Sequence, residues 1–377
     1  MNRYNFSAGP GALPESVLDA TQAAIRAIPE VGLSILGISH RSDWFRQAVD
    51  EAEDNIRQLL GLPGDYHVLF LQGGSSLQFS MIPMMLLRGR PTPAEYLRTG
   101  YWSSKSIPEA CREGEVRVLW DGEAHGFSRL PDDEELSFGQ EVSYFHYISN
   151  ETVEGLQFHR IPGRDDVLRI CDMSSDFLSR PIDVDRFSLI YAHSQKNLGP
   201  AGVTLVLLRD ELLQSAPDDL HTILDYRPHV AKRSIYNTPP VFAIYVTLLV
   251  TRWLRDEIGG LAAMEAINKA KAALLYQFLD ESPDFYRQRA AVQDRSVMNV
   301  VFNLPTPELE QRFLQATEAA GFAGLSGHRT IGGVRASLYN AVTIDAVAAL
   351  CEFMRDFQRR ANVSRSRANV SRSRAYG

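Results

Sequence analysis

The chain has 377 residues, of which 45% are hydrophobic and 23% charged, an ordinary globular composition that allows two domains or one large α/β domain with an appendage. Its net charge of -7 gives no basic footprint for nucleic acid, and no run of roughly eighteen apolar residues is present to span a membrane. The first residues lack the apolar core of a signal peptide, and three widely separated cysteines predict neither a disulfide framework nor a zinc site. We therefore expect a cytoplasmic protein that binds no nucleic acid, membrane or metal.

Short apolar runs alternate with helical patterns from about Leu13 to Leu208, which is typical of a mainly parallel sheet with helices on both faces. The runs expected to form strands include Val68–Leu71, Val116–Trp120, Tyr144–Ile148, Leu168–Cys171, Leu189–Ala192 and Val203–Leu208. Two helical patterns follow, one from Pro240 to about Leu254 and one from Leu261 to Leu279, and Gly259-Gly260 separates them.

The remaining region reads as a small α/β unit. It holds an apolar run at Val297–Phe302, a helix at Pro307–Ala320, a second run at Val334–Ser337 and a closing helix at Ile344–Arg360. We therefore predict a large domain over residues 13–258 and a small domain made of residues 1–12 and 259–360. Ala361–Arg367 recurs as Ala368–Arg374, and this polar, basic repeat predicts a disordered tail over residues 361–377.

A glycine-rich turn lies between the apolar run Val68–Leu71 and a helix-like segment at Leu77–Leu87. It contains Gly73-Gly74, which let the backbone approach an anion closely, followed by Ser75 and Ser76. A helix that begins there would offer unpaired N–H groups and the positive end of its dipole. The turn matches neither a Walker loop nor a Gly-x-Gly-x-x-Gly fingerprint, so it is a candidate phosphate cradle whose plain alternative is a simple turn.

Lys196 stands in a polar, glycine-bearing loop between two apolar runs, so that strand, turn and strand are expected here. The plain alternative is a lysine on a solvated surface turn. A lysine held between two buried strands loses hydration instead, and its amine becomes a usable nucleophile towards an aldehyde.

Asp172 ends the short strand that precedes the one leading to Lys196, and its plain alternative is a helix cap. Neighbouring strand ends would place the carboxylate and the amine on one edge of the sheet, where open α/β folds bind their ligands. Pyridoxal phosphate requires this pair, because a lysine bonds to its aldehyde and an acid keeps its pyridine nitrogen protonated.

Taken together, nine blocks of the sequence resemble the phosphoserine aminotransferases, which belong to the class V, fold type I pyridoxal-phosphate enzymes. In chain order the blocks are Asn5–Pro10, Ser39–Arg41, Gly100–Trp102, Asn150–Thr152, Asp172–Ser175, Gln195–Gly202, Tyr236–Pro240, Gly327–Arg329 and Val334–Asn340. The resemblance covers residues 3 to 360, and the blocks are specific in combination. It implies a large domain with a mainly parallel sheet, a small C-terminal α/β domain and pyridoxal 5'-phosphate as cofactor.

The resemblance also implies residue roles around the cofactor. Lys196 would hold it covalently and shuttle a proton, and Asp172 would pair with the pyridine nitrogen. Trp102 would stack on the ring and Thr152 would bond its phenolic oxygen, although a core aromatic and a simple turn threonine are their plain alternatives. The phosphate would be bound by Ser75, Ser76 and Gln195, with Asn237 and Thr238 reaching across from a second subunit. A homodimer with active sites at the interface follows.

For the substrate, the family handles a small acid that carries a phosphate and a carboxylate, so that cationic clamps are needed. The candidates are His40, Arg41, His328, Arg329 and Arg335. By resemblance, Arg335 takes the α-carboxylate and the two His-Arg pairs take the phosphate or the distal carboxylate of glutamate. A solvated loop is the plain alternative for either pair alone. The implied reaction interconverts 3-phosphohydroxypyruvate and glutamate with O-phosphoserine and 2-oxoglutarate in serine biosynthesis, with 4-phosphohydroxy-L-threonine of vitamin B6 biosynthesis as a further substrate.

One departure and several alternatives bear on this interpretation. Some members of the family carry Gly-Arg where this chain has Ser75-Ser76, so anion binding here would rely on N–H groups, hydroxyls and the helix end. An alanine–glyoxylate type aminotransferase would share Lys196 and Asp172 without needing phosphate clamps. A cysteine desulfurase needs a reactive cysteine in an active loop, and a nucleotide-binding module needs a P-loop lysine. A non-catalytic descendant of the fold would not be expected to keep both Lys196 and Asp172.

Overall fold

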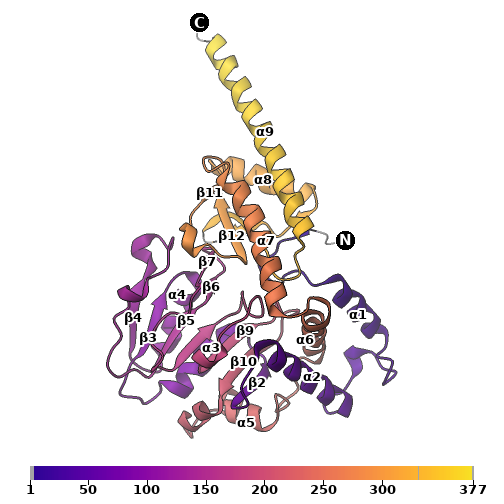
Figure 1. Ribbon diagram of the computed structural model, residues 1–377, viewed down its shortest axis with the longest axis vertical. Helices are drawn as coiled ribbons and strands as arrows, with labels where there is room; N and C mark the ends of the chain where they lie inside the picture. The colour runs from indigo at the N-terminus through magenta and orange to yellow at the C-terminus, as the bar shows by residue number, and fades with distance from the viewer. Residues whose placement is uncertain (1–3, 330, 376–377) are drawn as a thin grey trace.

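The computed structural model describes residues 4–329 and 331–375, with side chains as far as residue 362. Its larger part is built on one seven-stranded sheet (Figure 1). In spatial order the strands are β2 (Tyr66–Leu71), β10 (Thr204–Arg209), β9 (Leu189–His193), β8 (Arg169–Asp172), β5 (Tyr144–Ile148), β3 (Ala94–Arg98) and β4 (Val116–Asp121).

The strands from β9 to β4 are parallel, and β10 is antiparallel to both of its neighbours. This confirms the predicted mainly parallel sheet. The sequence analysis did not name β3, whose charged residue Glu95 interrupts the apolar pattern. Glu95 is buried, and its Oε1 accepts a hydrogen bond from the N–H of Gly139 at 2.9 Å, which compensates part of the cost of burying the carboxylate.

Helices cover both faces of this sheet, as predicted. They are α1 (Glu15–Arg26), α2 (Asp43–Leu60) and α6 (Val241–Arg252) on one face, and α3 (Gly74–Leu86), α4 (Tyr101–Ala110) and α5 (Tyr226–Ala231) on the other. Adjacent residues of β2 show why, because side chains of a strand alternate between its faces. Phe70 packs in one core with Ile56 of α2, and Leu71 packs in a second core with Phe79 of α3.

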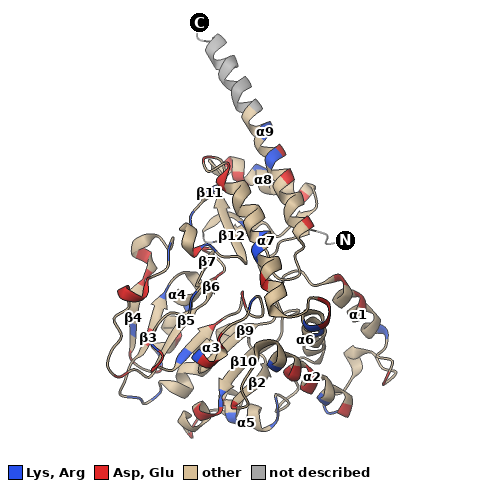
Figure 2. Cartoon of the chain, viewed as in Figure 1, with Lys and Arg blue, Asp and Glu red and all other residues tan. Residues whose placement is uncertain are grey.

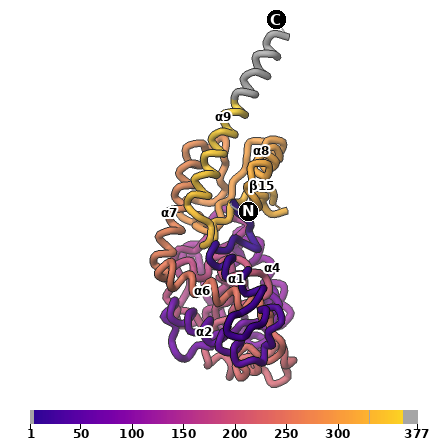
Figure 3. The backbone as a smooth tube through the Cα atoms, turned by 90° about the vertical axis from the view of Figure 1, so that its right-hand side faces the viewer, coloured from indigo at the N-terminus to yellow at the C-terminus, as the bar shows by residue number. Residues whose placement is uncertain are grey.

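A second, smaller sheet lies above the first in Figure 1 and is antiparallel throughout. Its spatial order is β11 (Arg287–Gln288), β12 (Asn299–Asn303), β15 (Gly332–Ser337) and β14 (Ser326–His328). The helices α7 (Leu261–Asp280), α8 (Pro307–Ala319) and α9 (Ile344–Ala375) lie around it, as Figure 3 shows from the side. The N-terminal strand β1 (Tyr4–Asn5) pairs in parallel with β13 (Phe322–Ala323) of this part.

Apolar side chains gather accordingly into separate cores. Phe6 shares its core with Leu275 of α7 and Val334 of β15, whereas residues of α2 and α6 share another. Between α6 and α7 the chain passes through a π-helical turn (Trp253–Glu257) and then Gly259 and Gly260, whose φ angles of 85° and 101° favour glycine. These features support the predicted division at residues 258 and 259, which stays a prediction.

The last helix differs from its predicted end at Arg360, because α9 continues to Ala375. No glycine or proline interrupts residues 344–375, and alanine and arginine favour helix, so the repeated segment can extend the helix although it is polar. The predicted disordered tail over residues 361–377 stays a prediction. Tyr376 and Gly377, the end of that predicted tail, lie outside the described residues.

The charged residues are distributed in a way that agrees with the small net charge. Figure 2 shows Lys and Arg interspersed with Asp and Glu over both parts of the molecule. None of the described helices combines the length and the apolar character that crossing a membrane requires. Among the described residues no group of three His, Cys, Asp or Glu side chains is arranged to hold a metal ion.

Candidate active site

A cavity of about 270 Å³ lies next to the carboxyl ends of β8 and β9, where open α/β sheets bind ligands. Seven residues singled out from the sequence line it: Ser75, Ser76, Trp102, Thr152, Asp172, Gln195 and Lys196. They come from five separate segments of the chain, so the fold brings together what the sequence distributes over more than a hundred positions.

Lys196 lies in a tight loop between β9 and β10, as the strand-turn-strand pattern predicted. The loop closes through the N–H groups of Leu198 and Gly199, which both donate to the carbonyl of Ser194 at 3.0 and 2.9 Å. The side chain of Lys196 is only 9% exposed, and its Nζ lies 3.4 Å from Oγ1 of Thr152. The amine is therefore held inside the cavity and directed at one hydroxyl.

Asp172 is the last residue of β8 and is 4% exposed. Its Oδ1 accepts a hydrogen bond from the N–H of Ser174 at 2.7 Å. Burial raises the pKa of Asp172 to about 6, although the bonds from Ser174 and the charge of Lys196 act in the opposite direction. The residues around Asp172 thus stabilise its ionised form only in part, and a cationic group of a ligand would stabilise it further.

The glycine-rich turn forms one end of the cavity, as proposed for a phosphate cradle. Helix α3 begins at Gly74, and Gly73 before it has a φ of 90° and makes no side-chain cap. The first N–H groups of the helix therefore have no partner within it and are available to an anion. Ser75 Oγ lies 2.7 Å from Oγ of Ser174, so the hydroxyl is oriented by the strand end that also carries Asp172.

Trp102 forms a wall of the cavity from the first turn of α4. Two buried carboxylates hold that turn, because Glu151 accepts from the N–H groups of Trp102 and Ser103 at 3.1 and 3.0 Å, and Glu154 accepts from that of Tyr101 at 2.9 Å. Burial raises the pKa of both carboxyls. The sequence analysis missed this pair, since capping across about fifty residues leaves no local pattern.

Arg335 and His328 lie beside the cavity on the small sheet. Nη1 of Arg335, on β15, is 3.4 Å from the carbonyl of Thr152, and its Nε is buried without a partner among the described residues. The ring centroid of His328, on β14, is 4.5 Å from that of Tyr101 on α4. Burial and the nearby charges of Arg335 and Arg329 lower the pKa of His328, and Arg329 itself is exposed.

Four predicted site residues are not brought to this cavity within one chain. His40 and Arg41 line a separate hollow of about 510 Å³ together with Tyr236. Asn237 lines another, of about 250 Å³, and the carbonyl of Thr238 accepts from Nε2 of Gln72 at 2.7 Å. That Asn237 and Thr238 serve a second subunit stays a prediction, and no such expectation was stated for His40 and Arg41.

Several further cavity residues were missed as individual candidates. They are Phe79, Ile148, Asn150, Ser174, Ser175, His193 and Ala201. Ser175 contacts the segment of a predicted residue, because its hydroxyl lies 3.0 Å from that of Thr152 and donates to the carbonyl of Asn150 at 2.9 Å. Three of them, Asn150, Ser174 and His193, lie two residues from a predicted site residue, and this closeness is the signal that could have found them.

The chemistry of this cavity fits one cofactor well. It offers a flat aromatic wall, an amine, a buried carboxylate and a helix N-terminus flanked by hydroxyls, in one space. Pyridoxal phosphate presents a planar ring, an aldehyde, a ring nitrogen and a phosphate, and each finds a complement among these residues.

Comparison with known proteins gives the class first. The family model for class-V aminotransferases matches residues 3–350, and the chain belongs to this family. Within it, the chain is 48% identical over 96% of its length to the phosphoserine aminotransferase of Laribacter hongkongensis and 46% identical over 95% to that of Geobacillus kaustophilus, covering 99% and 98% of those proteins. The chain is thus a member of the phosphoserine aminotransferase family.

Solved structures agree. The phosphoserine aminotransferase of Bacillus circulans subsp. alkalophilus superposes with a TM-score of 0.92 at 45% identity, over 95% of this chain and 99% of that one. The pyridoxal-phosphate-bound phosphoserine aminotransferase of Trichomonas vaginalis gives 0.87 at 35%, over 94% and 99%. An alanine–glyoxylate aminotransferase from Nostoc, 17% identical with a TM-score of 0.71, shares the fold alone. The predicted fold type I is confirmed.

Proposed function

We propose that this chain is a pyridoxal-phosphate-dependent transaminase that interconverts 3-phosphohydroxypyruvate and L-glutamate with O-phospho-L-serine and 2-oxoglutarate, a step of serine biosynthesis in the cytoplasm. The observation that carries the proposal is the joint placement of Lys196 and Asp172 in one cavity at neighbouring strand ends. The nearly full-length similarity to phosphoserine aminotransferases supports the choice of substrate.

Residues of the cavity divide the work of holding the cofactor. Ser75, Ser76 and Gln195 bind its phosphate at the start of α3, where a helix end and hydroxyls stand in for the arginine that some relatives carry. Trp102 covers one face of its ring and excludes water, and Thr152 bonds its phenolic oxygen. The cofactor, when bound, supplies an electron sink for the carbanion at the substrate Cα.

The two catalytic residues control protons. Asp172 holds a proton on the ring nitrogen, since an ionised carboxylate buried at this point is stabilised by a cation beside it. Lys196 would hold the cofactor covalently, and its amine would carry the proton between the substrate Cα and C4′ of the cofactor. The hydroxyl of Thr152, 3.4 Å from Nζ, orients that amine.

Substrate recognition comes from the cations at the mouth of the cavity. Arg335 binds the α-carboxylate. Its Nη1 reaches the carbonyl of Thr152, and its buried Nε has an N–H without an acceptor among the described residues, so it can donate to a ligand. His328 and Arg329 bind the phosphate of phosphoserine or the distal carboxylate of glutamate.

We further propose a homodimer in which a second copy completes each active site. His40, Arg41, Asn237 and Thr238 would then reach the cofactor phosphate and the substrate of the neighbouring subunit. Support comes from the location of His40, Arg41 and Tyr236 around one surface hollow that is separate from the cavity of Lys196.

Mixed dimers test this arrangement. Lys196→Ala and Arg41→Ala copies should each be inactive. Every mixed dimer would contain one intact site, and random exchange makes half of all dimers mixed. Activity should therefore return to about a quarter of the wild-type value after random exchange of subunits. No recovery in dimers shown to be mixed would place Arg41 and Lys196 in the same subunit's site.

The substrate assignment is tested by comparing amino donors with 2-oxoglutarate as acceptor. Phosphoserine should be preferred to serine and alanine by about a hundredfold or more in kcat/KM, because each lost charge-assisted hydrogen bond costs roughly 1.5–3 kcal/mol. 4-Phosphohydroxy-L-threonine is expected to be a further donor. Equal efficiency with serine and phosphoserine would favour an alanine–glyoxylate type activity instead.

A further inference from the structure

Lys271, on α7, is a buried lysine that takes no part in the chemistry described above. Its side chain is fully buried, although lysine is rarely so. Nζ donates to the carbonyls of Leu338 and Tyr339 at 3.0 and 2.9 Å, and the carbonyl of Asn340 lies at 3.5 Å. An ammonium has three protons to donate, and three consecutive carbonyls converge on it.

The segment held by Lys271 touches the loop that carries the cofactor lysine. It directly follows β15, the strand of Arg335, and the N–H of Asn340 donates to Oδ1 of Asn197 at 3.0 Å. Asn197 is the neighbour of Lys196, and its own Nδ2 donates to the carbonyl of Ser175 at 3.1 Å. Two hydrogen bonds therefore lead from Lys271 to the residue adjacent to Lys196.

A second residue of α7 supports the same segment. Asn268 lies one turn before Lys271, so both side chains point the same way from the helix. Nδ2 of Asn268 is 2.9 Å from Oδ1 of Asn340 and 3.0 Å from the carbonyl of Ser179. Tyr339, whose carbonyl Lys271 binds, places its ring centroid 5.8 Å from Nζ of Lys196. The end of β15 is thus fixed by α7 on one side and faces Lys196 on the other.

We propose that Lys271 is a positioning residue for Lys196: by holding residues 338–340, it fixes Asn197 and directs the Lys196 amine into the cavity. The proposal rests on the proposed function in that Lys196 is the residue that captures the cofactor. Replacement of Lys271 by an apolar side chain leaves three converging carbonyls without their donor. The segment then shifts, Asn197 loses a fixed partner, and the amine no longer stays where the aldehyde is presented.

The test follows covalent capture of pyridoxal phosphate by the cofactor-free protein, without any substrate. At saturating cofactor, Lys271→Met should lower the first-order rate constant of the absorbance change on bonding to Lys196 by about ten- to a hundredfold, because the step depends on alignment. A merely structural role would lower the melting temperature and leave this saturated rate unchanged, so an unchanged rate in a folded variant overturns the proposal.

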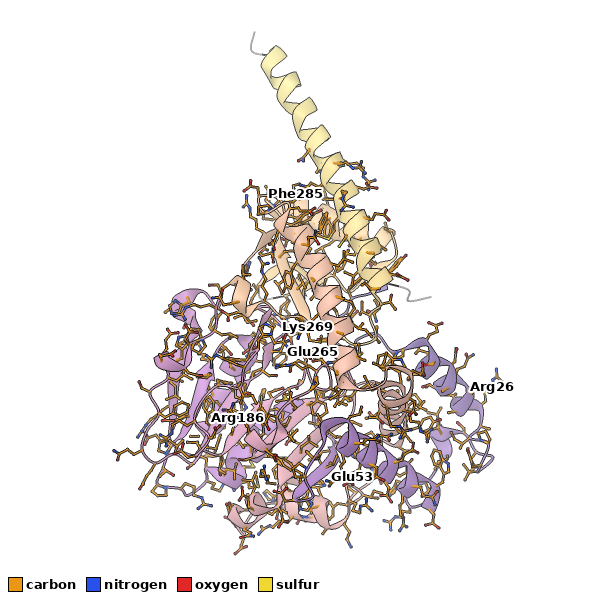
Figure 4. The ribbon with its side chains drawn as sticks, in the orientation of Figure 1. Arg26, Glu53, Arg186, Glu265, Lys269 and Phe285 are labelled. Atoms are coloured by element: carbon orange, nitrogen blue, oxygen red, sulfur yellow. The ribbon has the colours of Figure 1, made fainter. Side chains whose placement is uncertain are left out.

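Lys269→Met is the matched control. Lys269 lies two residues earlier on α7, is exposed, and pairs with Glu265 at 2.7 Å. Figure 4 labels both residues. Its loss should leave the capture rate unchanged, and a drop as large as that of Lys271→Met would refute a specific role for Lys271.

A second variant covers the case in which Lys271→Met does not fold. Asn197→Ala removes the acceptor of the Asn340 N–H and keeps Lys271 in place, so the capture rate should fall comparably. A wild-type rate in Asn197→Ala overturns the proposal. The capture assay contains no amino donor, so it does not depend on the proposed substrate. If the proposed function were wrong, the protein would capture the cofactor normally and fail to transfer the amino group of phosphoserine.

Discussion

Lys196 and Arg335 meet at one residue, Thr152. Nζ of Lys196 lies 3.4 Å from its hydroxyl, and Nη1 of Arg335 lies 3.4 Å from its carbonyl. The amine that would hold the cofactor and the cation that would hold the substrate carboxylate therefore contact the same residue, although they belong to the two different sheets. A substrate bound through its carboxylate to Arg335 would have its Cα near that amine.

Replacing Asp172 by Asn should reduce turnover far more than substrate affinity. Asparagine keeps the shape and can still accept the Ser174 N–H, but it cannot hold a proton on the ring nitrogen. Because the electron sink acts mostly in the transition state, kcat should fall strongly while KM changes little. Steady-state kinetics with phosphoserine checks this. Near-normal turnover would show that Asp172 only caps the turn after β8.

The same residue predicts a pH-dependent stability of the cofactor-free protein. Burial raises the pKa of Asp172 from 3.8 to about 6, so the folded state keeps its proton to higher pH than the unfolded chain. The ionised group is therefore destabilising: the cost is absent below about pH 4, grows from there to about pH 6 and is complete above it. At about 1.4 kcal/mol per pH unit the full cost is roughly 3 kcal/mol.

Asp172→Asn should accordingly be more stable than the wild type above pH 6 when both lack cofactor, and the difference should vanish near pH 4. Denaturant unfolding across this pH range measures it. Pyridoxal phosphate should stabilise the wild type more than the variant, since its ring nitrogen supplies the missing cation. A variant that is less stable at pH 8, with no trend towards pH 4, would show that this carboxylate is not destabilising.

Arg329 and Arg335 should differ in what they recognise. Arg335 lies by the backbone of Thr152 and is mostly buried, whereas Arg329 is exposed in the turn after β14. Arg329→Leu should weaken the use of phosphoserine more than that of serine, while Arg335→Leu should weaken both alike. The measurement is kcat/KM for the two donors with each variant. A uniform loss in Arg329→Leu would remove it from the phosphate clamp.

Sequence reasoning succeeded where the signal is local. The loop of Lys196 was predicted because two apolar runs enclose it, and Asp172 was predicted because it ends one. It failed where a partner comes from far along the chain. Strand β3 was not predicted, because it contains the charged residue Glu95. Glu151 caps a helix that lies about fifty residues earlier in the chain, and Lys271 donates to carbonyls nearly seventy residues away. Residues far away in the sequence compensate these buried charges, so the sequence next to each of them contains no pattern that predicts its burial.

Reductive labelling tests the central claim, that Lys196 is the cofactor lysine, most directly. The protein purified with pyridoxal phosphate should be yellow, and borohydride should fix the cofactor to the peptide that contains Lys196, as peptide mapping by mass spectrometry would show. Lys196→Ala should lose both the label and catalysis. Labelling of any other lysine in the wild-type protein would contradict the account.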